Sequence, residues 1–145
     1  MSPKEFLGKE NEKLIMDAIA SAEHQTSGEI RVHLEGKCRG EVLDRAAWLF
    51  KKLKMNNTEE RNGVLIYLSV NDHKFAIIGD SGINKVVPEG FWNAIKEMMI
   101  IHFSKGEFAI GLTKGIEKAG EQLKQYFPWQ NNDVNELSDE ISYGI

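Results

Sequence analysis

Side chains that carry oxygen donors are predicted to gather at one edge of a small β-sheet. Glu29 opens a first strand-like segment, Asn62 precedes a second, and Asp80 and Ser81 follow a third. A helical segment links the first two strands, so they should run parallel, and a tight turn makes the third antiparallel. Carboxylate, amide, hydroxyl and carbonyl oxygens are the ligands that Ca²⁺ prefers. The sequence therefore predicts a calcium site at this edge. The alternative, a carboxylate that bonds only the amides of its own loop, stays open.

The segment GDSG (residues 79–82) also matches the turn that holds the nucleophile of trypsin-like serine proteases. A nucleophilic Ser81 would need a histidine base and an orienting acid, and the histidines of this chain show no triad pattern. That protease fold is all-β, whereas this chain alternates strands with helices. The protease interpretation is therefore rejected. Gly79 and Gly82 are instead expected to let the backbone turn sharply around Asp80.

A second group of acidic side chains is predicted at the opposite edge of the sheet. Asp44 and Asp72 are the second-choice metal ligands there, in the company of Glu35, Glu41 and Asn71. Ligands of open α/β sheets favour the carboxyl ends of parallel strands. However, Asp44 lies in the first turn of a predicted helix, where the helix dipole already explains an acidic residue. This edge therefore ranks second.

The elements that must position these residues alternate between helical and strand patterns. Apolar residues at helical spacing predict helices over about 9–24, 41–54, 88–105 and 108–126. Strands are predicted over 29–35, 64–70 and 74–78. The first strand alternates between apolar and polar residues, and the second is apolar on both faces and hence central. The fold class is α/β, a small mixed sheet with a parallel βαβ crossover and an antiparallel hairpin strand, flanked by helices on both faces.

The charge of the chain is unevenly distributed. Its 145 residues carry 18 basic and 22 acidic side chains, a net charge of −4. Residues 1–128 are balanced and form one predicted domain, whereas the predicted tail, 129–145, has no base. The acidic residues of this tail are Asp133, Glu136, Asp139 and Glu140. A balanced body lacks the basic face of a nucleic-acid-binding protein, so no nucleic-acid partner is predicted. An unknown protein partner stays open.

Membrane insertion is not predicted. The N-terminal residues lack the apolar run of a signal peptide, and the longest apolar stretch, GVLIYLSV, is too short to span a bilayer. We therefore expect a cytoplasmic location. Cys38 is the single cysteine, so neither an internal disulfide nor a cysteine-based zinc site is expected.

The order of these motifs resembles the TPM-domain family, named for a thylakoid lumen phosphatase-like protein, a photosystem II repair factor and a receptor modulator. The resemblance covers roughly residues 14–127. The segments that carry it are TSGEIRVHLE, DRAAWLFKKLKM, RNGVLIYLSVNDHKFAIIGDSGI and FSKGEFAIGLTKGIEKAGEQL. It implies a mixed sheet flanked by helices and an ion or substrate site at the edge that holds Glu29 and Asp80.

The resemblance implies two possible functions, because the TPM-domain family includes acid phosphatases and Ca²⁺-binding proteins. The first is a stand-alone TPM-like domain that binds Ca²⁺ at the sheet edge, with little or no catalysis. The alternative is a metal-assisted acid phosphatase that acts on small phosphate esters. The sequence shows no evident phosphoryl nucleophile, and Arg61 is the arginine beside the predicted edge.

Overall fold

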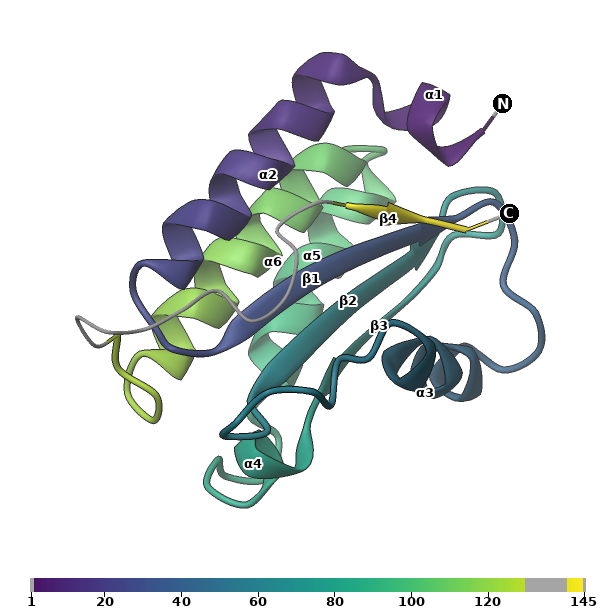
Figure 1. Ribbon diagram of the computed structural model, residues 1–145. Helices are drawn as coiled ribbons and strands as arrows, with labels where there is room; N and C mark the ends of the chain where they lie inside the picture. Colours follow the sequence, from purple (N-terminus) through teal and green to yellow (C-terminus); the bar gives the residue numbers. More distant parts are fainter. Residues whose placement is uncertain (1, 130–140, 145) are drawn as a thin grey trace.

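A four-stranded mixed sheet forms the centre of the computed structural model, which describes residues 2–129 and 141–144 (Figure 1). The strands are β1 (Glu29–Glu35), β2 (Gly63–Ser69), β3 (Lys74–Gly79) and β4 (Ser142–Tyr143). They lie in the order β3-β2-β1-β4. β2 and β4 each pair parallel with β1, and β3 pairs antiparallel with β2. This arrangement confirms the predicted α/β class, with β4 as an addition that the sequence did not predict.

Helices cover both faces of this sheet. They are α1 (Pro3–Leu7), α2 (Lys9–Glu23), α3 (Val42–Lys52), α4 (Ser81–Asn84), α5 (Asn93–Ser104) and α6 (Phe108–Leu123). Figure 1 shows α3 on one face and the group of α2, α5 and α6 on the other. The predicted start of α5 at Pro88 is wrong. Gly90 has a φ of +78°, outside the helical region, so residues 88–92 form a turn-rich loop before the helix begins.

The sheet separates two apolar cores. On one face, residues such as Ile30, Val32 and Ile66 pack against α2, α5 and α6. On the other face, Leu65 and Tyr67 pack against α3. Every residue of β2 is buried, which confirms that it is the central strand.

The polar side of β1 lies on the α3 face, because the register pairs His33 with Tyr67. The alternating pattern of β1 is typical of a strand whose polar face is solvated, but in the structure the polar face of β1 is largely covered. His33 is 4% exposed and Glu35 only 1%. Two buried titratable side chains need polar partners, and these partners form part of the site described below.

The remaining sequence predictions concern the acidic tail, the membrane, the location and the nucleic-acid partner. The acidic residues predicted for the tail, Asp133, Glu136, Asp139 and Glu140, lie outside the described residues. None of the helices in the described ranges is long and apolar enough to cross a bilayer. The cytoplasmic location and the lack of a nucleic-acid partner stay predictions.

Candidate functional site

Asp80 lies at the predicted edge of the sheet, and its carboxylate is already engaged. The side chain is 6% exposed. Arg61 binds it with two hydrogen bonds, from Nε to Oδ2 at 2.8 Å and from Nη2 to Oδ1 at 3.0 Å. The amide of Ser81 donates to Oδ1 at 2.7 Å, so the same carboxylate caps α4. The Arg61 side chain is 49% exposed, so solvent reaches this ion pair from one side.

Glu29 and Asp80 flank Gly63 on the α3 face of the sheet. Glu29 pairs with Gly63 in the register of β1 and β2, and the Asp80 amide donates to the Gly63 carbonyl at 2.9 Å. Neighbouring strands are about 4.8 Å apart, so the two acidic residues are separated by about 10 Å at the backbone. Gly63 has no side chain, so no side chain of β2 lies between them at this position. The structure thus brings these two predicted ligands to one face.

The other two predicted ligands are Asn62 and Ser81. Asn62 precedes Gly63, so strand alternation places it on the opposite face. Its amide nitrogen donates to Glu60 at 3.1 Å and to Ser27 at 3.4 Å. The Ser81 side chain is exposed. Across the described residues, no group of three or more His, Cys, Asp or Glu side chains has an arrangement that could hold a metal ion.

The two glycines of the GDSG segment serve close packing. Neither Gly79 nor Gly82 has a positive φ, so the change of direction at Asp80, between the end of β3 and the start of α4, does not use the left-handed conformation that glycine allows. A Cβ atom on Gly82 would lie 2.6 Å from the Arg61 carbonyl oxygen and closer still to that of Glu60. The start of α4 therefore rests directly on the backbone that carries Arg61. This contact fixes the position of the ion pair.

A cavity of about 200 Å³ opens beside Asp80. One wall comes from α3, and the remaining lining residues come from the following loop and the end of β3. The lining residues are Ala47, Phe50, Lys51, Asn56, Arg61, Ile78, Gly79 and Asp80. Two cationic side chains and one amide surround a single carboxylate, so the cavity can accept an anionic group next to Asp80.

The opposite edge holds a buried network centred on Glu35. Its carboxylate accepts hydrogen bonds from Arg45, at 3.0 Å from Nε and also from Nη2, and from the Tyr67 hydroxyl at 2.6 Å. Burial alone would raise the pKa of Glu35, but the hydrogen bonds from Arg45 and Tyr67 outweigh it and lower the pKa. Glu35 is therefore a buried anion neutralised by Arg45. In the sequence this glutamate was one member of an acidic group, and its basic partner was not identified.

The second-choice metal ligands at this edge have separate local roles. Asp44 is exposed in the first turn of α3, which Glu41 caps by accepting from the Leu43 and Asp44 amides at 3.1 and 3.2 Å. Asp72 accepts hydrogen bonds from the Cys38 amide at 3.1 Å and from the Ser69 hydroxyl. The bond from Ser69 is the main reason that the pKa of Asp72 is lowered. Their role as metal ligands stays a prediction.

Comparison with known proteins shows the relationship of this chain directly. A family model for the TPM domain matches residues 1–122. The chain belongs to the TPM domain family. It is similar to the solved structure of the BA42 protein from the psychrophilic bacterium Bizionia argentinensis, with 52% identity over 97% of each chain and a TM-score of 0.92.

A more distant structure shares the fold of this TPM domain. It is the N-terminal domain of a protein from P. gingivalis, with 22% identity, a TM-score of 0.67, and coverage of 83% of this chain and 79% of that one. A comparison with curated proteins found no match.

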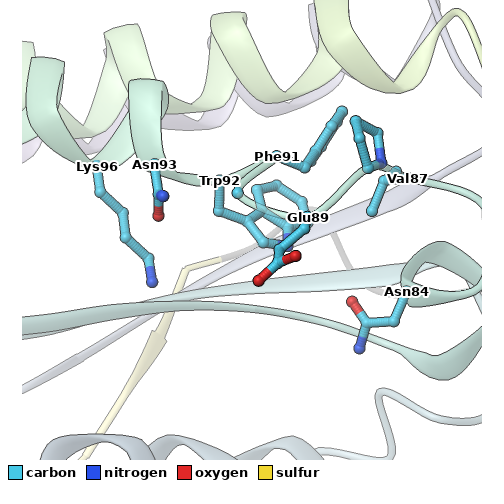
Figure 2. Close-up of a pocket in the computed structure, with 9 residues that line it drawn as sticks. Asn84, Val87, Glu89, Phe91, Trp92, Asn93 and Lys96 are labelled. Atoms are coloured by element: carbon cyan, nitrogen blue, oxygen red, sulfur yellow. The ribbon is translucent and has the colours of Figure 1, made fainter.

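A second cavity of the TPM domain lies between the end of α4, the loop that follows it and the first turns of α5. It has a volume of about 400 Å³ and is lined by Asn84, Lys96 and the loop 87–93. In Figure 2, Trp92 and Glu89 lie between Lys96 on one side and Asn84 on the other. Trp92 also packs on Gly79, where an added Cβ would lie 2.8 Å from its ring. This loop, expected as helix from the sequence, connects the second cavity to the segment that holds Asp80.

The C-terminal strand supplies residues that the sequence analysis missed. Ser142 Oγ lies 2.7 Å from His33 Nδ1, and His33 Nε2 lies 3.4 Å from Glu35 Oε1. Tyr143 donates a hydrogen bond to Glu12 of α2. A strand of two residues has no periodicity that a sequence pattern can reveal, so only the structure shows these contacts.

Proposed function

We propose that this TPM domain binds a divalent cation, with Ca²⁺ as the expected ion, at the sheet edge that carries Asp80. The observation that supports it is the ion pair at this edge, where a half-exposed Arg61 holds both oxygens of a nearly buried carboxylate. In this arrangement the guanidinium of Arg61 occupies the position that a bound metal ion would take next to the Asp80 carboxylate. A metal ion can replace it because the arginine side chain is free to swing into solvent on its exposed side.

Glu29 supplies the second carboxylate of the proposed site. It lies across Gly63 from Asp80 and on the same face. With Ca²⁺–oxygen distances of about 2.4 Å, an ion over Gly63 is within reach of both side chains. Ca²⁺ takes six to eight oxygen ligands, so water molecules complete the shell in this proposal. Asn62 and Ser81 are not required as side-chain ligands.

The test is an amide NMR titration with Ca²⁺, with Mg²⁺ as the comparison ion. Saturable shifts are expected at Glu29, Gly63 and Asp80 and should disappear in Asp80→Asn. Asp72→Asn at the opposite edge is the matched control and should leave them unchanged. Arg61→Gln should strengthen Ca²⁺ binding, because it removes the competing cation. A lack of saturable shifts would refute the proposal.

Hydrolysis of small phosphate esters is a second candidate function, favoured by the cavity beside Asp80. Lys51 and Arg61 in its walls can bind phosphate oxygens, and a bound cation could activate water there. Turnover of p-nitrophenyl phosphate should then follow the protein through purification. It should be lost in Asp80→Asn and Lys51→Gln but kept in the control Asp72→Asn. Activity that survives both changes would come from a contaminant.

A further inference from the structure

The outer side of α3 is a surface that the proposed cation site does not use. Figure 1 shows α3 on one face of the sheet. The inner side of the helix, which faces the sheet, is buried through Ala46, Leu49 and Phe50. The outer side carries two rows of residues at a spacing of four. One row consists of Leu43, Ala47 and Lys51, and the other of Asp44, Trp48 and Lys52; all six are exposed.

Two large apolar side chains lie on this outer side. Leu43 and Trp48 are each 51% exposed. The Arg45 guanidinium carbon lies 4.7 Å from the Trp48 ring centroid, and the Lys52 ammonium lies 5.8 Å from it. A tryptophan next to basic groups is typical of the interface between a bilayer and water.

The same part of the chain is strongly basic. Residues 37–54 contain six basic and two acidic side chains, a net charge of +4, whereas the whole chain carries −4. The basic residues that are exposed are Lys37, Arg39, Lys51, Lys52 and Lys54. The balanced composition of residues 1–128 conceals this local excess, because the compensating acidic residues lie elsewhere in the domain. Lys51 and Lys52 share the outer rows of α3 with Leu43 and Trp48, and the other three lie in the segments directly before and after the helix.

We propose that the outer face of α3 docks on an anionic phospholipid bilayer. The domain lies on the bilayer without crossing it, with Leu43 and Trp48 at the level of the headgroups and the lysines against the lipid phosphates. Nucleic acid fits this surface less well. Base stacking needs an open aromatic face, and Arg45 and Lys52 lie over the ring of Trp48.

The orientation has a consequence for the cavity beside Asp80. Lys51 belongs to the outer row of α3 and also lines that cavity. A domain docked through α3 therefore holds the cavity next to the lipid headgroups.

The test is flotation with vesicles of phosphatidylcholine and phosphatidylserine, compared with vesicles of phosphatidylcholine alone. A chelator is present throughout, so the result is independent of cation binding at Asp80. Binding is expected only to the anionic vesicles and should weaken as salt is raised. The double change Lys52→Gln and Lys54→Gln should weaken binding to the anionic vesicles about 25-fold, because each lost charge lowers the affinity about fivefold.

Two matched controls separate this surface from general effects of charge and hydrophobicity. Lys114→Gln with Lys124→Gln, on and beside α6, changes the net charge equally and should leave vesicle binding unchanged. Leu43→Ser should weaken binding, whereas Ile100→Ser should not, although Leu43 and Ile100 are equally exposed at 51%. Thermal unfolding of each variant checks that it is folded.

Three outcomes would overturn the proposal. Equal binding to both kinds of vesicle, or none to either, would exclude an anionic bilayer as the partner. An equal loss in the control pair on α6 would show that only the overall charge matters. Tighter binding to single-stranded DNA than to anionic vesicles would assign the surface to nucleic acid instead.

Discussion

Replacing Tyr67 by phenylalanine removes one hydrogen bond from the Glu35 carboxylate and keeps the aromatic ring. The hydroxyl lies 2.6 Å from Glu35 Oε2, and Tyr67 and Glu35 are 0% and 1% exposed. A hydrogen bond to a charged group contributes about 1.5–3 kcal/mol, and no cavity is created. Tyr67→Phe should therefore lower the free energy of unfolding by about 2 kcal/mol, which corresponds to a decrease in Tm of about 6 °C.

The assay is urea unfolding at neutral pH, followed by circular dichroism, together with a thermal scan. Tyr126→Phe is the control, because the Tyr126 ring packs on Phe91 at a partly exposed position. In a Glu35→Gln background the effect of Tyr67→Phe should shrink to about 1 kcal/mol, since the acceptor is then uncharged. A Tyr67→Phe variant as stable as the wild type, or an undiminished loss in that background, would refute the reasoning.

Two more predictions concern the glycine contact and the buried histidine. Gly82→Ala places a Cβ against the backbone carbonyls of Glu60 and Arg61, so thermal unfolding should show a loss of about 3 kcal/mol; an unchanged Tm would contradict the contact. Burial lowers the pKa of His33 below 6.5 although nearby Glu35 acts to raise it, so the folded state favours the neutral ring. The stability that the neutral His33 ring contributes is therefore present above pH 6.5 and is lost as the pH falls toward and through the lower pKa of the folded state. The free energy of unfolding should fall by up to about 1.4 kcal/mol per pH unit in this range. Unfolding measured over this pH range should show that slope, and His33→Asn should abolish it.

The sheet could be predicted because its signals are local and periodic. Alternation marked β1, and the uninterrupted apolar run marked β2 as buried on both faces. The start of α5 was predicted wrongly, since Pro88 suits a first helical turn but Gly90 adopts a left-handed conformation two residues later. A single glycine gives no indication of which φ it will take.

The candidate site was predictable in its position and less so in its contacts. Chain order and strand direction were enough to bring Glu29 and Asp80 to one edge of the sheet. The ion pair of Asp80 with Arg61 depends on a loop whose arginine has a φ of +53° and whose backbone contacts Gly82. The partners of Glu35 come from a helix and from the neighbouring strand. Such contacts between distant segments leave no pattern in a single sequence.

The short strand β4 also bears on how the molecule avoids self-association. β1 would otherwise be an edge strand, and exposed edge strands can recruit strands from other molecules into aggregates. β4 pairs with β1 at His33 and Leu34. Nearer the start of β1, the Glu23 carboxylate accepts a hydrogen bond of 3.1 Å from the Ile30 amide. A two-residue strand and one side chain thus blunt the edge at two points. Residues joined directly after β4, such as a purification tag, would begin beside this protection.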